Sequence, residues 1–282
     1  MIRKYPHLET ERLGAVLILR LDNEAARNSL SREMRISMRE VIRDVEDDYT
    51  VRAIYMTAKG PTFCSGGDLR MLTDAHAPWA VHRRFRYAST LFPALTTLNR
   101  PVVCGVRGTA IGGGMGLALM SDMIVAGESA EFSAGFFRLG VVPDCLTLFT
   151  LPRVVGLAKA RNFIYGNGLW KASDLLDLGI AAKVVPDDQL DAEGLALAQR
   201  LAEGPAEVMG LAKQLLLRSF ESSLSEMMDY EGFGQVLAMS GVEFEEGLTA
   251  LVERRKPDFL TASHAKPVGD GMPSAQSRTR TE

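Results

Sequence analysis

Cysteine is scarce in this sequence of 282 residues, and the three that occur, Cys64, Cys104 and Cys145, are widely spaced. An odd number of separated cysteines is typical of free thiols in a reducing compartment, so we expect a cytoplasmic protein without disulfides. Histidine is almost as rare: the four histidines show no metal-ligand spacing, and no Cys-x-x-Cys pair occurs. The sequence therefore predicts no metal site.

Long apolar runs and an excess of charge of one sign are also missing. No apolar stretch reaches the ~18 residues that a membrane-spanning helix needs. No apolar run follows the charged first residues, so a signal peptide is not expected. The net charge of −3 gives no general attraction to nucleic acid or to an anionic membrane. We therefore expect neither of these as a partner.

What is present is an alternation of short apolar runs and segments of helical periodicity. Strands are expected at residues 16–21, 53–57, 101–106, 123–126, 131–133 and 184–185. A helix is expected from Ser31, its N-cap, to Val45, and another over residues 81–98. Strand, turn and helix in succession predict an α/β fold with right-handed connections.

Beyond about residue 189 the periodicity is helical, over residues 190–203, 205–220, 225–240 and 243–255. From Thr261 onward Ser, Thr, Gly, Pro and Arg dominate and the apolar periodicity ends. Such a composition favours disorder. We therefore divide the chain into a core of residues 1–195, a helical region of residues 196–260 and a disordered tail of residues 261–282.

Two glycine-rich turns, FCSGGDL at 63–69 and AIGGGMG at 110–116, carry the chemistry. Each follows an expected strand and leads into an expected helix, where backbone N–H groups point outward and the helix adds partial positive charge. One such loop alone is as often only a tight bend, and neither matches a phosphate-binding or dinucleotide-binding motif. Two aimed at one point would hold a carbonyl oxygen as it gains negative charge, which is an oxyanion hole.

An ordered series of segments resembles the crotonase (enoyl-CoA hydratase/isomerase) superfamily from about residue 16 to residue 259. The segments are ARNSL (26–30), FCSGGDL (63–69), RPVV (100–103), GGG (112–114), SDMIVA (121–126), LGVVPD (139–144), LPRVVG (151–156) and RRKPDF (254–259). The resemblance implies a spiral of β-β-α turns with a C-terminal helical trimerisation region. It also implies a homotrimer or dimer of trimers and an acyl-CoA thioester as substrate, with no separate cofactor.

By position in the family motifs, the N–H groups of Gly67 and Gly113 would be the oxyanion donors. The resemblance also places a CoA-binding set on Arg27, Ser65, Gly66, Asp68, Gly112 and Lys256. Arg27 would contact the CoA phosphates, and Lys256, with Arg254 and Arg255, would reach the 3′-phosphate of CoA bound to its own or a neighbouring subunit. Simpler roles stay open: a solvated loop for Arg27, a turn or cap for Asp68, and a helix C-terminus for Lys256.

Both glutamates of the family's hydratases are absent. One should follow the triple glycine by two positions, where this chain has Gly116, and the other should precede Asp144 by eight, where it has Phe136. Neither residue can accept or donate a proton, so ordinary hydration of an enoyl-CoA is not expected. The dehalogenase branch is disfavoured as well, because its histidine and tryptophan positions hold Pro93 and Phe136.

Asp144 is the remaining candidate for the acid/base group. Its apolar sequence neighbours, among them Leu139, Val141 and Val142, predict a setting that would suit a general base. The alternative is that Asp144 caps the helix that follows. A thiol nucleophile at Cys145 is less favoured than a small buried hydrophobe, because no paired histidine is evident.

The stretch around Asp144 looks most like that of ring-1,2-epoxyphenylacetyl-CoA isomerase-type members, which also shift Δ3 double bonds to Δ2. Those members usually continue with Gly-Gly-Thr, whereas this chain has Cys145-Leu146-Thr147, so the acyl pocket should differ. One base suffices for an isomerase. We expect an acyl-CoA isomerase; the alternatives are a hydratase or hydrolase that uses Asp144 and water, and a non-catalytic CoA-thioester binding protein.

Overall fold

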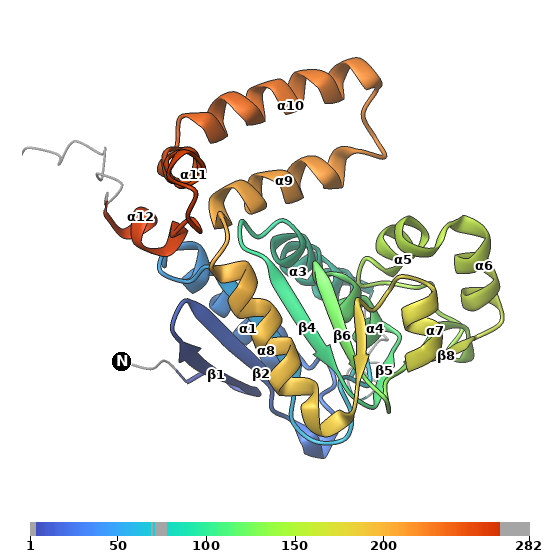
Figure 1. The fold of residues 1–282 in the computed structure, drawn as a ribbon. Helices are drawn as coiled ribbons and strands as arrows, with labels where there is room; N and C mark the ends of the chain where they lie inside the picture. Colours follow the sequence, from blue (N-terminus) through green and yellow to red (C-terminus); the bar gives the residue numbers. More distant parts are fainter. Residues whose placement is uncertain (1–3, 69, 71–77, 266–282) are drawn as a thin grey trace, which may run out of the picture.

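Two sheets organise the chain, whose computed structural model describes residues 4–68, 70 and 78–265 (Figure 1). The larger sheet has the order β1 (Leu8–Leu13), β2 (Val16–Leu21), β3 (Ala53–Ala58), β4 (Val102–Val106), β6 (Met123–Gly127) and β9 (Lys183–Val185). The smaller one has the order β5 (Thr109–Ile111), β7 (Glu131–Ser133) and β8 (Leu169–Lys171). All strand pairs are parallel except β1 with β2 and β7 with β8. The predicted α/β class is confirmed.

The two sheets are linked as successive turns of one spiral. After each of the strands β2, β3, β4 and β6, the chain adds a short extended segment to a second layer. Leu30 forms a parallel bridge with Gly67, Cys64 forms one with Ala110, and β5 pairs with β7. This stacking places the two glycine-rich turns next to each other, although 46 residues separate Gly67 from Gly113 in the sequence.

Helices cover both faces of the larger sheet, which explains why its central strands β3 and β4 are buried at every residue. On one face lie α1 (Arg32–Glu46), α3 (Pro78–Thr96) and α4 (Gly113–Leu119), and on the other α8 (Leu190–Ala202). Successive side chains of a strand point to opposite faces of the sheet: Ile54 packs in the hydrophobic cluster that contains residues of α1, and Tyr55 packs in the cluster that contains residues of α8. The predicted cap is confirmed, because the Ser31 hydroxyl accepts a hydrogen bond from the N–H of Met34.

The remaining helices are shorter or lie toward the C-terminus. Before β9 come η1 (Glu24–Ala26), η2 (Phe136–Arg138), α5 (Thr147–Val155), α6 (Leu157–Tyr165) and α7 (Ala172–Asp177). After β9 come η3 (Asp187–Gln189), α8, α9 (Ala206–Arg218), α10 (Leu224–Met239), α11 (Val242–Glu253) and α12 (Phe259–Ala265). In Figure 1, α9 and α10 extend away from the larger sheet. The expected C-terminal helical region is thus present.

Two of the expected divisions need correction. The boundary at residue 195 falls inside α8, whose Leu190, Ala198 and Ala202 are all buried against the sheet, so the core continues to the end of this helix. The tail expected from Thr261 begins with the helix α12. Asp258 starts this helix by accepting hydrogen bonds from the N–H and hydroxyl of Thr261. Residues 266–282 lie outside the described residues.

Large apolar side chains remain exposed on the C-terminal helices. On α10, Leu224 is 81% exposed and Phe233 is 74% exposed, and Val236 and Leu237 are exposed as well. A monomer rarely leaves so large an apolar surface in water. None of the described helices is long and apolar enough to cross a membrane.

Candidate active site

The two glycine-rich turns touch through their backbones. Cys64 donates its N–H to the carbonyl of Thr109 and accepts from the N–H of Ile111, which extends the smaller sheet into the first turn. Gly66 has a φ of +89°, and a Cβ there would lie 2.6 Å from the Ile111 oxygen and 3.4 Å from the nitrogen of Gly113. Only glycine permits this approach.

The N–H groups of Gly67 and Gly113 are available at this junction. Among the described residues, neither donates a backbone hydrogen bond. Gly113 is the first residue of α4, after the N-cap Gly112, so its N–H belongs to the unsatisfied first turn of a helix. Gly67 is exposed, and a Cβ there would meet nothing within 4 Å. The helix that we expect after the first turn falls largely on residues 69 and 71–77, which lie outside the described residues.

Asp144 lies beside the second turn. A Cβ placed on Gly113 would lie 2.9 Å from Cys145 Sγ, 3.3 Å from Leu30 Cδ1 and 3.8 Å from Asp144 Oδ1. A carboxylate oxygen, a thiol and a methyl group therefore converge on one oxyanion candidate. The structure brings together Asp144 and Gly113, which the sequence could relate only through the family resemblance.

Two expectations for Asp144 are wrong. It is not the N-cap of α5, because that position belongs to Leu146, which makes no side-chain capping bond. It is also not enclosed by its apolar sequence neighbours: Asp144 is exposed within the single chain, as are Leu139, Val141 and Val142, the last at 73%. These side chains instead face solvent in the segment that precedes the aspartate.

The two positions that the family resemblance assigns to hydratase glutamates are both closed by packing. A Cβ on Gly116 would lie 2.6 Å from the carbonyl oxygen of Cys145 and 2.8 Å from Thr147 Oγ1. Phe136 is buried, and its ring lies 3.5 Å from the Cβ position of Gly112. The segment after Asp144 and an aromatic ring thus occupy the space beside the second turn.

Cys145 and Leu146 adopt an uncommon backbone conformation. Their φ angles are +52° and +56°, in the left-handed region that favours glycine. Burial, followed by the charge of Asp144 and a hydrogen bond to it, raises the pKa of the Cys145 thiol well above its usual range. Cys145 therefore keeps its proton at neutral pH, which argues against a thiolate nucleophile.

Most of the predicted CoA-binding residues gather near the first turn. The carbonyl of Arg27 accepts the N–H of Ser65, and the Ser65 hydroxyl contacts the carbonyl of Ala26. The exposed Arg27 side chain makes no hydrogen bond or ion pair with any described residue. Asp68 binds both the N–H and the guanidinium of Arg70, as expected for a turn residue.

Lys256 stands apart from this group. It follows α11 and pairs with Glu203, at the end of α8, at 2.8 Å. The segment between α11 and α12 lies away from α4 and β5 in Figure 1. Within one chain, the structure does not bring Lys256 to the glycine turns.

One residue near the site was missed by sequence reasoning. Arg35, half-buried on α1, is close enough for its charge to favour the ionised forms of both Asp68 and Cys145. Its spacing from Ser31 could have identified it. Arg35 lies four residues after this N-cap, near the end of α1 that is close to the first glycine-rich turn.

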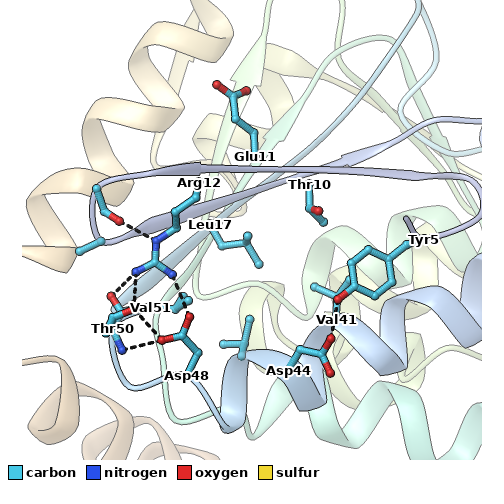
Figure 2. A pocket seen from close by; sticks show the side chains of 13 residues that line it. Tyr5, Thr10, Glu11, Arg12, Leu17, Val41, Asp44, Asp48, Thr50 and Val51 are labelled. Atoms are coloured by element: carbon cyan, nitrogen blue, oxygen red, sulfur yellow. Dashed lines mark hydrogen bonds and ion pairs between the residues drawn. The ribbon is translucent and has the colours of Figure 1, made fainter. Parts of the chain in front are cut away.

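A groove of about 920 Å³ lies elsewhere, between the β1–β2 hairpin and α1 (Figure 2). Its polar side chains satisfy each other: the Tyr5 hydroxyl donates to Asp44, and Arg12 contacts Asp48 and Thr50. None of the predicted site residues lines it. The groove is therefore not part of the candidate site.

Comparison with known proteins agrees with this geometry. Residues 11–262 match the family model described as enoyl-CoA hydratase/isomerase. The chain is 34% identical to a 1,2-epoxyphenylacetyl-CoA isomerase of Escherichia coli K12 over 86% of this chain and 94% of that protein. It is 31% identical to a probable enoyl-CoA hydratase of Mycobacterium bovis, over 90% and 98% of the two chains.

Solved structures give the same fold. A crystal structure of an enoyl-CoA hydratase/isomerase from Cupriavidus metallidurans CH34 superposes with a TM-score of 0.87 at 28% identity, over 92% of this chain and 97% of that one. An enoyl-CoA hydratase from Polaromonas sp. JS666 gives a TM-score of 0.85 at 27% identity, over 89% and 98%. The spiral, the adjoining glycine turns and the family match lead to one conclusion: the chain belongs to the enoyl-CoA hydratase/isomerase family and has the crotonase fold.

Proposed function

We propose that this family member is an acyl-CoA isomerase that shifts a double bond, or rearranges a ring, through an enolate. In this proposal the N–H groups of Gly67 and Gly113 hold the thioester oxygen, and Asp144 alone transfers the proton. The observation that carries it is the position of Asp144 Oδ1, 3.8 Å from the Cβ position of Gly113, in a site where Gly116 and Phe136 replace both hydratase glutamates.

A double-bond shift needs one base. The Asp144 carboxylate takes a proton from C2 of a 3-enoyl thioester, and the electron pair moves into the thioester carbonyl to form a dienolate. The resulting carboxylic acid returns the same proton at C4, which leaves a 2-enoyl thioester. Atoms and charge balance without an oxidant, a reductant or a metal, so we propose no cofactor besides the CoA of the substrate.

The oxyanion donors supply most of the stabilisation in this scheme. Charge develops on the thioester oxygen during proton removal, and fixed N–H groups stabilise it without having to reorient. Loss of one such donor typically costs ~3 kcal/mol of transition-state stabilisation. We further propose that Arg27 contacts the CoA phosphates, because its backbone joins the first turn and its exposed side chain makes no hydrogen bond or ion pair with a described residue.

A second candidate has one observation in its favour. Asp144 is exposed, so its carboxylate could instead activate a water molecule for addition to a double bond or for thioester hydrolysis. The two candidates differ in substrate and product. An isomerase converts a 3-enoyl-CoA to the conjugated 2-enoyl-CoA, while a hydratase consumes crotonyl-CoA.

The deciding experiment compares these two substrates with wild type and Asp144→Asn. We expect conjugation of a 3-enoyl-CoA, followed by ultraviolet absorbance, to fall about 10²- to 10⁴-fold in the variant. Asp177→Asn, an exposed aspartate on α7, is the matched control and should keep wild-type turnover. Steady hydration of crotonyl-CoA without isomerisation would refute the isomerase. Turnover unaffected by Asp144→Asn would refute Asp144 as the base. Binding of acyl-CoA with no turnover of either substrate by wild type would favour a non-catalytic binding protein.

We also propose that the chain forms a homotrimer or a dimer of trimers through its C-terminal helices. The exposed Leu224, Phe233 and Val236 of α10 support an interface there. In a trimer, Lys256 would also be able to reach CoA bound to a neighbouring subunit. Light scattering of the purified protein tests the proposal, and a monomer at micromolar concentration would refute it.

A further inference from the structure

Cys145 contributes the side-chain atom nearest to the second oxyanion candidate. Its Sγ lies 2.9 Å from the Cβ position of Gly113, closer than Leu30 at 3.3 Å or Asp144 at 3.8 Å. The sulfur therefore shares with the Asp144 carboxylate the small space on the side of Gly113 where a Cβ would lie. A displacement of either group would therefore change the position of the other.

The backbone fixes the direction of this side chain. Cys145 and Leu146 both have left-handed φ angles, and the carbonyl of Asp144 accepts the N–H of Thr147 across this turn. Residues other than glycine persist in such conformations only where their surroundings hold them, and such positions are common at functional sites. The turn directs the Cys145 side chain toward Gly113 while its carbonyl packs against Gly116.

The thiol is suited to donate a hydrogen bond to its neighbour. Burial and the adjoining Asp144 charge keep Cys145 protonated at neutral pH, and a protonated thiol has one donor to offer a carboxylate. A donor that meets one carboxylate oxygen limits the rotation of the whole group. The other oxygen is then free to face the substrate.

A second feature of the same turn is a buried polar group. Thr147 is fully buried, its hydroxyl has no partner among the described residues, and it lies 2.8 Å from the Cβ position of Gly116. A buried hydroxyl without a partner is costly, and the surrounding packing must compensate for it. The unpartnered hydroxyl lies in the packed space between this turn and Gly116, so the turn is held tightly against α4.

We propose that Cys145 is a positioning residue for Asp144: its side chain, held against Gly113, fixes the aspartate carboxylate beside the oxyanion hole. This inference rests on the proposed function, because it assumes that Asp144 transfers the proton. Cys145 itself forms no bond to the substrate and takes up no proton in the reaction. Its contribution is to the orientation of the base.

Two substitutions separate this role from a packing role. Cys145→Ser keeps a donor of similar length, and we expect its kcat to stay within about threefold of wild type. Cys145→Gly removes the side chain and relieves the left-handed backbone, so its melting temperature should hold or rise. Its kcat should nevertheless fall about tenfold or more, with KM for the acyl-CoA changed less than about twofold.

The outcomes distinguish this inference from the proposed function. Wild-type kcat in Cys145→Gly would overturn the positioning role, as would a Cys145→Ser variant that falls as far as Cys145→Gly. Asp144→Asn is measured in the same assay. If Asp144→Asn is inactive while Cys145→Gly is unaffected, only the present inference fails; if Asp144→Asn is fully active, both fail.

Discussion

A single methyl group added at Gly116 tests whether the position of the missing glutamate is closed in this chain. Gly116 lies inside α4, where alanine would ordinarily be favoured over glycine by about 0.5–1 kcal/mol. Here the methyl would lie 2.6 Å from the Cys145 carbonyl oxygen and 2.8 Å from Thr147 Oγ1. A backbone oxygen cannot rotate aside, so the segment after Asp144 must shift.

The two effects have opposite signs and similar sizes. Overpacking of a closed position costs about 1–3 kcal/mol, which exceeds the helix gain by about 1 kcal/mol. Activity should change more than stability does. The shift carries Asp144 with it, and a displacement of about 1 Å of a catalytic group can cost ~10²-fold in rate. We expect Gly116→Ala to fold with slightly reduced stability and to lose most of the isomerase activity that we propose.

Gly232→Ala is the matched control, because Gly232 is also inside a helix, α10, but a Cβ there would meet nothing within 4 Å. It should gain about 0.5–1 kcal/mol in the free energy of unfolding and keep its activity. Urea denaturation and the 3-enoyl-CoA assay measure both variants. If Gly116→Ala gains stability as Gly232→Ala does and keeps its kcat, the position is open and the reasoning is refuted.

Two further predictions concern parts of the chain that support the site. The side chains of Arg52 and Glu243 are 3% and 4% exposed and pair at 3.0 Å, so Arg52→Met should cost about 3–5 kcal/mol in chemical denaturation by leaving a buried charge unpaired. Lys256→Ala breaks an exposed pair and should change the free energy of unfolding little. Equal losses of stability in Arg52→Met and Lys256→Ala would contradict this difference between a buried and an exposed pair. Asn28→Ala removes three hydrogen bonds from the loop that carries Arg27, so it should lower the free energy of unfolding by about 3 kcal/mol and raise KM for acyl-CoA. Asn28→Gly loses the same bonds but tolerates the φ of +52°, so the two variants together separate the hydrogen bonds from the backbone strain. An unchanged KM in both would show that the loop does not bind substrate.

The central strands of the larger sheet were predictable because they are buried on both faces. β3 and β4 are buried at every residue, so their apolar runs are continuous. β1 was missed because it is an edge strand whose Glu11, Arg12 and Leu13 are exposed. Its polar composition has no strand signature, and only its pairing with β2 defines it.

The sequence predicted the site where a glycine indicates a backbone conformation with positive φ. It did not predict the site where residues other than glycine adopt such a conformation. Gly66 and Gly112 have positive φ angles and identified both turns. Cys145 and Leu146 also have left-handed φ angles, which no sequence rule predicts for these residue types. This turn delays the start of α5 to Thr147, so the expectation that Asp144 caps the helix failed. The exposure of Asp144 likewise depends on tertiary packing, which apolar neighbours in sequence do not determine.

The replacement of the first glutamate and the conformation of the turn after Asp144 are physically coupled. A side chain at position 116 and the carbonyl of Cys145 compete for the same space, because only 2.6 Å would separate them. Gly116 therefore permits the left-handed turn, and the turn directs Cys145 toward Gly113. Introducing glutamate at 116 alone would collide with this turn before its carboxylate could reach a substrate. Conversion of this site to a two-glutamate hydratase must accordingly change the segment after Asp144 together with Gly116. For the same reason, the single carboxylate that we propose for the site depends on the packing of this segment and not on residue 116 alone.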